Sequence, residues 1–148
     1  MRYRIIGQTD EIIYSEILKI AFEESDNFSI CSFKRYHKKD LADSYFDFFN
    51  QISMYEKDAY AFHTPNHYER GQKFHVFELN EYTKALIGTV KSFRGWMAPN
   101  YPEDLSFYRN KKVWLYCISH ENLIFIETEN DELIRKFLNL GIRFVKEQ

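Results

Sequence analysis

The sequence has few of the residues on which several protein classes depend. Its 148 residues include five Gly, three Pro and two Cys. The glycines are too scattered to form a phosphate-binding loop. Cys31 and Cys117 lie far apart and show no C-x-x-C spacing, which disfavours a secreted disulfide framework. We therefore interpret both as reduced, partly buried thiols of a cytoplasmic protein, with a single disulfide between them as the alternative.

Long apolar runs and an excess of one charge are also missing. The longest apolar run, Val113–Ile118, has the length of a strand, whereas a membrane-spanning helix needs about 18 apolar residues. The first residues, MRYRIIGQTDE, contain no secretory apolar segment. Lys and Arg total 20 against 22 Asp and Glu, a formal charge of −2. A nucleic-acid partner is therefore unexpected, because such binders usually show a basic excess, and no membrane contact is expected.

Aromatic residues are abundant: 14 Phe, 11 Tyr and two Trp make up 18% of the chain. With 45% hydrophobic and 28% charged residues, the chain has the size and composition of one domain over residues 1–148. Aromatic side chains are enriched both in cores and at interfaces between proteins. The excess therefore indicates either a ring-rich core or a surface that binds a protein partner or a second copy.

Apolar periodicity predicts one α+β domain with a mixed or antiparallel sheet and about four helices. The expected helices are residues 10–23 with Thr9 as N-cap, a second capped by Asp40, a third capped by Asn80 and ending at Gly95, and a fourth whose capping box begins at Thr128 and which ends at Gly141. The expected strands are residues 2–6, 27–36, 73–79, 105–108, 112–119, 123–128 and a final edge strand at 142–145.

Three of these strands follow one another closely and predict a C-terminal meander followed by a helix. Asn110-Lys111 supplies one tight connection, and the segment from His120 to Asn122 supplies the other. Val113–Ile118 is apolar at both odd and even positions, so this strand needs cover on both faces. Helices on both sides would provide that cover, and so would a second subunit on one side.

The irregular segment Met54–Gln72 holds the main cluster of metal-ligand types: His63, His67 and Glu69. Two imidazoles and a carboxylate suit zinc or another divalent metal. Pro65 prevents the regular helix that would place both histidines on one face. Either the loop brings the three together on a divalent metal, or the histidines are solvated and the protein has no cofactor.

Two other groups of side chains are candidates for chemistry. Cys117 and His120 could pair as nucleophile and base, but residues three apart on a strand point to opposite faces. His120 and Glu121 are instead expected at a hairpin tip, where they are the remaining catalytic candidates. The adjacent carboxylates Glu103 and Asp104 carry little weight, since such pairs are common.

The only basic run supplies a candidate patch, made of Lys34, Arg35, Lys38 and Lys39. With the aromatic residues around it, the patch could contact phosphate or an acidic partner. The alternative is an ordinary solvated connection between a strand and a helix.

The segment from Pro102 to Tyr108 (PEDLSFY), followed by Trp114 and by Ile118-Ser-His-Glu121, resembles small bacterial proteins of unknown function. Some of these proteins carry a stage III sporulation label. The resemblance covers about the last third of the chain and implies no reaction.

Together these patterns favour a small non-catalytic domain that binds another protein or itself. The alternative is a small metal-dependent hydrolase, or a metal-binding protein, that uses His63, His67 and Glu69.

Overall fold

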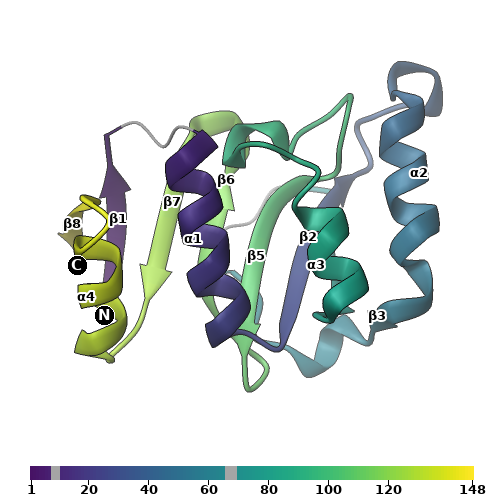
Figure 1. Ribbon diagram of the computed structural model, residues 1–148. Helices are drawn as coiled ribbons and strands as arrows, with labels where there is room; N and C mark the ends of the chain where they lie inside the picture. The colour runs from purple at the N-terminus through teal and green to yellow at the C-terminus, as the bar shows by residue number, and fades with distance from the viewer. Residues whose placement is uncertain (8–10, 66–69) are drawn as a thin grey trace.

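The computed structural model describes residues 1–7, 11–65 and 70–148. Within this part of the chain, one sheet has the strand order β3-β4-β2-β5-β6-β7-β1-β8 (Figure 1). All neighbouring strands in it are antiparallel. The strands are β1 Arg2–Ile6, β2 Asn27–Phe33, β3 Glu56–Lys57, β4 Gln72–Glu78, β5 Glu103–Arg109, β6 Lys112–Ile118, β7 Leu123–Glu127 and β8 Arg143–Glu147. The predicted α+β class is confirmed, and the sheet is antiparallel.

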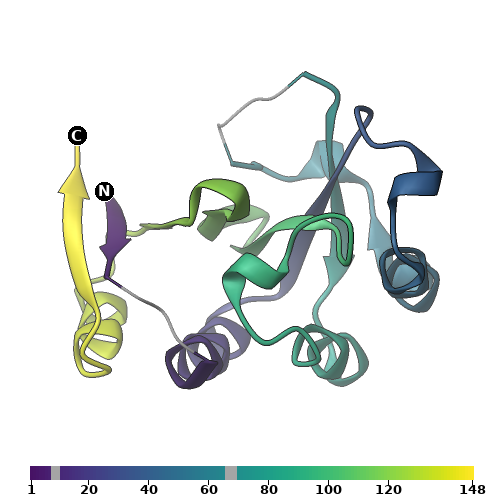
Figure 2. The ribbon, with the colours of Figure 1, turned by 90° about the horizontal axis from the view of Figure 1, so that it is seen from above.

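The described residues form four α-helices, and all four lie on the same side of the sheet (Figure 2). The described residues between β3 and β4, residues 58–65 and 70–71, lie on the opposite side (Figure 2). The helices are α1 Glu11–Glu24, α2 Asp43–Ile52, α3 Glu81–Ile87 and α4 Asp131–Leu138. The two faces of the sheet are therefore covered differently, because helices pack on one face and irregular chain on the other.

The C-terminal meander lies in the middle of the sheet. The strands β5, β6 and β7 stand between β2 and β1, and four antiparallel steps make β1 and β2 run in the same direction. The predicted meander and its following helix α4 are confirmed. Asn110 and Lys111 form the β5–β6 turn with φ of 51° and 65°, as a tight hairpin turn requires.

One helix start agrees with its predicted cap. Asn80 accepts a hydrogen bond from the backbone N–H of Thr83, whose hydroxyl accepts one from the N–H of Asn80. This reciprocal cap starts α3 at Glu81. The predicted end at Gly95 is wrong, because α3 ends at Ile87, and Val90 and Phe93 enter the core from the loop that follows.

Two other predicted caps are wrong. Asp40 closes a short 3₁₀ turn and is followed by the extended Leu41, so α2 begins at Asp43 with Ala42 as its N-cap. The fourth helix is capped by Asn130, whose side chain accepts hydrogen bonds from two backbone N–H groups, and not by Thr128. Thr9, the predicted cap of α1, lies outside the described residues.

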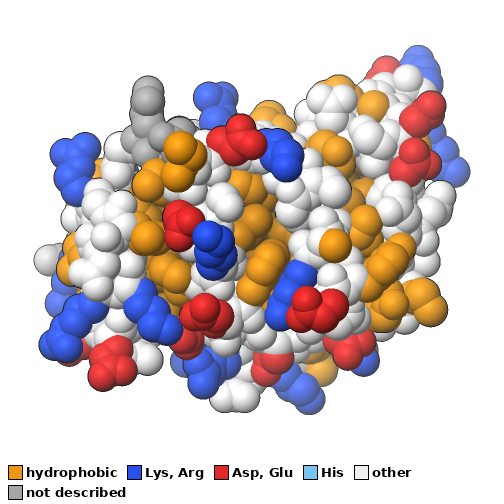
Figure 3. All heavy atoms as spheres, in the orientation of Figure 1, with side chains coloured by type: hydrophobic (Ala, Val, Ile, Leu, Met, Phe, Trp, Pro, Cys, Tyr) orange, Lys and Arg blue, Asp and Glu red, His pale blue; other side chains and the backbone are white. Residues whose placement is uncertain are grey.

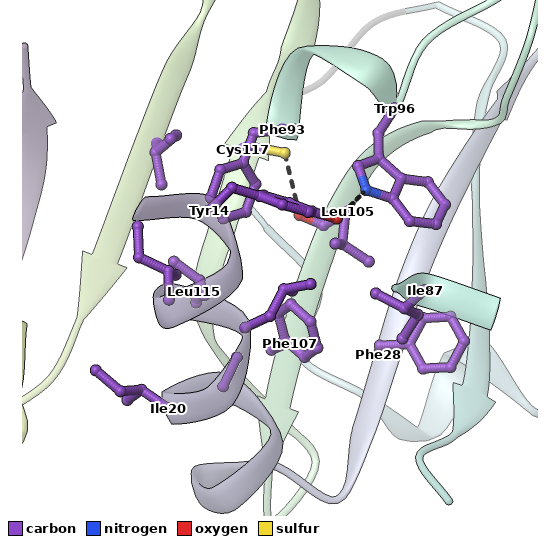
Figure 4. Packing of buried hydrophobic residues seen from close by; sticks show 14 of the residues in the cluster. Tyr14, Ile20, Phe28, Ile87, Phe93, Trp96, Leu105, Phe107, Leu115 and Cys117 are labelled. Carbon is purple, nitrogen blue, oxygen red and sulfur yellow. Dashed lines mark hydrogen bonds between the residues drawn. The ribbon is translucent and has the colours of Figure 1, made fainter. Parts of the chain in front are cut away.

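The main core lies between the helices and the sheet, and much of it is aromatic. Phe28 and Phe77 stack across β2 and β4, while Phe107 lies beneath α1 (Figure 4). The Trp96 indole N–H donates to the Tyr14 hydroxyl over 3.0 Å, so the two polar atoms satisfy each other inside the core (Figure 4). A large part of the aromatic excess is therefore core packing.

The opposite face of the meander has a second, smaller apolar cluster, formed by Tyr108, Val113 and Tyr116. Phe62, from the segment between β3 and β4, packs edge-on against Tyr108 at a centroid distance of 5.6 Å. This contact covers part of the second face, where helices or a second subunit were expected.

The helical face shows acidic and basic side chains interspersed, with apolar side chains visible between the helices (Figure 3). No helix among the described residues combines the length and apolar character needed to cross a bilayer.

Candidate metal centre

The structure places one of the three predicted metal ligands. His63 is exposed, and its backbone bonds to Lys111 and Val113 at the turn end of the β5–β6 hairpin. His67 and Glu69 lie outside the described residues. The seven residues of β5 span about 20 Å, so His63 lies near one end of this hairpin and Glu103 at the other.

The two thiols are free, as predicted, and both are fully buried. Cys117 donates to the Leu105 carbonyl over 3.1 Å and lies 3.6 Å from the Ser119 hydroxyl. Burial raises the pKa of both thiols well above the ordinary value, and the negative charge of Asp104 adds to the effect. Neither thiol is therefore primed as a nucleophile.

A different group of side chains converges at the open end of the β5–β6 hairpin. Glu103 and Asp104 begin β5, and His120 lies in the 3₁₀ turn Ser119–Glu121 that follows β6. Each of Glu103, Asp104 and His120 offers one ligand atom, and these atoms lie within 4.8 Å of one another. We call these three residues the acid–histidine cluster.

Hairpin pairing creates this convergence. Ser106 pairs with Tyr116, so the residues before Ser106 lie beside those that follow β6. The Asp104 Oδ1 atom accepts a hydrogen bond of 2.8 Å from the Ser119 backbone N–H. Asp104 has a φ of 60°, a conformation that Asp tolerates better than most residues. Its carboxylate thereby holds the turn that carries His120.

Both carboxylates are removed from solvent, each residue being 1% exposed. The Glu103 Oε1 atom accepts a 2.6 Å hydrogen bond from the Tyr36 hydroxyl. Its Oε2 atom is buried without a hydrogen-bond partner among the described residues, and the Arg35 guanidinium lies 4.0 Å away. Burying two adjacent carboxylates is costly unless cations or hydrogen bonds compensate them.

His120 connects this buried pair to solvent. Its side chain is 42% exposed and lies 3.7 Å from the Glu121 carboxylate. One ligand of the cluster is therefore accessible from outside, and the other two are not.

The charge of the cluster acts on neighbouring phenols. Burial raises the pKa of Tyr45 to about 12, and the carboxylate of Glu103 contributes to the rise. Burial also raises the pKa of Tyr36, and its hydrogen bond to Glu103 adds to the effect, while Arg35 opposes it. These phenols stay neutral near pH 7. The Arg35 guanidinium lies 4.0 Å from Glu103 Oε2.

All four residues of the predicted basic patch, Lys34, Arg35, Lys38 and Lys39, are exposed, and one of them, Arg35, also approaches the acid–histidine cluster. Arg35 stacks on Phe33 and Tyr36, with its guanidinium carbon 4.4 and 4.8 Å from the two ring centroids, and approaches Glu103. Arg35 therefore belongs to the surroundings of the cluster.

A cavity of about 640 Å³ lies near the other end of the meander, lined among others by Arg109, Glu24 and Trp114. Arg109 and Glu24 pair within it at 2.6 Å. Its charges therefore already compensate each other in part, and the acid–histidine cluster is the stronger candidate site.

Sequence reasoning named His120 and Glu121 as candidates but set aside Glu103 and Asp104. A signal was present: both carboxylates directly precede the apolar start of a central strand. The segments on which the predicted resemblance is based, 102–108 and 118–121, also contain all three residues of the cluster.

No protein-family model, curated protein or solved structure matches this chain. We therefore infer the function from the geometry of the acid–histidine cluster, and the resemblance to sporulation-labelled proteins stays a prediction.

Proposed function

We propose that the protein is a divalent-cation-binding domain whose ion lies between Glu103, Asp104 and His120. The observation that carries the proposal is the buried carboxylate pair, with one Glu103 oxygen lacking a hydrogen bond among the described residues, beside an imidazole within 4.8 Å. In tetrahedral geometry, two metal–ligand bonds of about 2.1 Å place the ligand atoms about 3.4 Å apart, so the three side chains must close by at most about 1.4 Å.

The donor set indicates which ion to expect. One imidazole nitrogen and two carboxylate oxygens suit Zn²⁺ or Mn²⁺, whereas Ca²⁺ prefers six to eight oxygen ligands. Three protein ligands leave room for water or for an anionic group of a substrate, on the side where His120 reaches solvent. A metal-activated water would make the domain a small hydrolase. The sequence predicted such a hydrolase as the alternative function, but with His63, His67 and Glu69 as the metal ligands.

A domain that only held a partner would gain nothing from this arrangement. Burying a carboxylate reduces stability unless a cation or hydrogen bonds compensate it, and the buried Glu103 Oε2 atom has no hydrogen bond among the described residues. A bound cation would compensate this atom, and for this reason we place cation binding ahead of the purely non-catalytic role.

Calorimetric titration of chelator-treated, untagged protein with Zn²⁺, Mn²⁺ and Ca²⁺ tests the proposal. We expect one site that prefers Zn²⁺ or Mn²⁺. Replacing His120 by Ala or Glu103 by Gln should weaken binding at least about 10-fold. Glu81→Gln, at an exposed carboxylate on α3 outside the cluster, is the control and should bind normally. His63→Ala separates this cluster from the site predicted around His63.

Thermal unfolding provides a second reading of the same variants. Metal at about 100 times its dissociation constant should stabilise the parent by about 2.7 kcal/mol. Metal-free Glu103→Gln should be at least as stable as the parent, because an amide oxygen still accepts from Tyr36 while one buried charge is removed. A less stable Glu103→Gln, with no response of the parent to metal, would show that the pair is structural.

A further inference from the structure

The free edge of β8 is a second surface with a specific complementarity. β8 is the last strand of the sheet and pairs with β1, so its other side faces outward (Figures 1 and 2). It has five residues, against two in β3 at the opposite edge of the sheet. A long unpaired edge is a template for pairing with another strand.

The sequence of this edge is complementary to itself. When two β8 strands run antiparallel about Val145, Arg143 of each copy lies opposite Glu147 of the other, and Phe144 lies opposite Lys146. Cross-strand pairs of opposite charge stabilise a sheet. Centring the pairing one residue later would bring the two Lys146 side chains together, and centring it one residue earlier would produce no charge pair. One register is therefore favoured.

Apolar side chains near this edge add to the charge pattern. Val145 is 39% exposed and lies at the centre of the proposed pairing. Leu138 of α4 is 51% exposed. Lys136 of the same helix reaches Glu24 of α1 at 2.9 Å, and two residues correspond to about 200° of helix turn. Leu138 therefore points away from α1, toward the β8 side of α4.

We propose that two copies of the chain associate through their β8 edges, antiparallel and centred on Val145. Pairing residues of the same parity keeps the helices of both copies on one face of a continuous sheet. The acid–histidine cluster takes no part in this contact, so the proposal is independent of metal binding. It assigns a surface to the self-association that the sequence suggested.

Charge reversal tests the register directly. Arg143→Glu places two carboxylates opposite each other in every pair, and Glu147→Arg places two guanidinium groups there. We expect each single variant to raise the dimer dissociation constant at least about 10-fold in analytical ultracentrifugation over a dilution series. The double variant, and an equimolar mixture of the two single variants, should dimerise like the parent.

Two controls make the result specific to this edge. Lys57→Glu reverses a charge on β3 and should leave the dimer intact. Hydrogen exchange should slow at residues 144–147 as protein concentration rises. Circular dichroism of Glu147→Arg checks the fold, because Glu147 also pairs with Arg4 at 2.7 Å. A parent protein that stays monomeric up to about 1 mM, or a dimer indifferent to both single reversals, overturns the proposal.

Discussion

The two faces of strand β5 are equally buried but differ in chemistry. Leu105 and Phe107 point into the main core beneath the helices, and Ser106 and Tyr108 point to the other side. All four are 0% exposed. The apolar pair is held by contact area alone, whereas Ser106 donates to the Asp104 carbonyl and the Tyr108 hydroxyl bonds to Ser29 over 2.8 Å.

This difference shows what each face contributes. Apolar burial is non-directional and supplies most of the stability. Hydrogen bonds in a buried site hold groups at defined positions, and this side of β5 holds the backbone next to the metal-candidate residues. The helical face therefore keeps the domain folded, and the other face positions the acid–histidine cluster.

Removing Phe107 should have the largest effect on this comparison. Phe107→Ala leaves a cavity between α1 and the sheet, so we expect the free energy of unfolding to fall by about 3–5 kcal/mol. Urea denaturation measures the loss. Tyr82→Ala, at a side chain that is 47% exposed, should change stability much less. Similar losses at both positions would contradict the assignment of Phe107 to the main core.

Removing one hydroxyl on the opposite face should have a smaller effect. Tyr108→Phe leaves the buried Ser29 hydroxyl without its partner, and we expect a loss of about 1–2 kcal/mol. Ser29→Ala together with Tyr108→Phe should lose less than the sum of the two single changes, because neither polar group is then stranded. Strict additivity in the double-mutant cycle would mean that the hydroxyls do not interact.

The imidazole of His75 on β4 should make the stability of the protein depend on pH. Burial lowers the pKa of its imidazole, and the nearby Glu56 carboxylate opposes this in part. The unfolded chain then binds a proton more readily than the folded one, so stability should fall as pH drops below the unfolded pKa of about 6.5.

His75→Gln should reduce this loss of stability. The amide can still bond to Ser32, which His75 contacts over 2.7 Å, and it does not titrate. Unfolding curves for both proteins between about pH 7.5 and 5 give the comparison. We expect a smaller change in stability for His75→Gln than for Phe107→Ala or Tyr108→Phe. If the stability of the parent protein rises on acidification, the pKa of His75 is not lowered by folding.

Local chemistry predicted some elements well. Asn80 caps its helix because the partner Thr83 is three residues away and needs no distant contact. Asn110 and Lys111 form the predicted turn for the same reason. Two predictions were wrong where a local cap competed with packing. The second helix has Ala42 as its N-cap and not Asp40. The third helix ends at Ile87, and the residues after it bring Val90 and Phe93 into the core.

The candidate site was predictable only in part. His120 was identified as a hairpin-tip residue, but its partners, Glu103 and Asp104, lie more than 15 residues earlier. Their meeting depends on the hairpin register, which shifts between Phe107 and Tyr108. A single sequence does not reveal such an irregularity, because the apolar pattern on either side of it looks continuous.

The sequence by itself determined the α+β class and the meander, because apolar periodicity and turn residues act over a few neighbouring positions. Only the tertiary structure decided that the meander lies between β1 and β2, that the helices share one face, and that two carboxylates are buried beside His120. The physical reason is that periodicity reports which side of an element is apolar. Which apolar sides meet depends on packing all the elements at once.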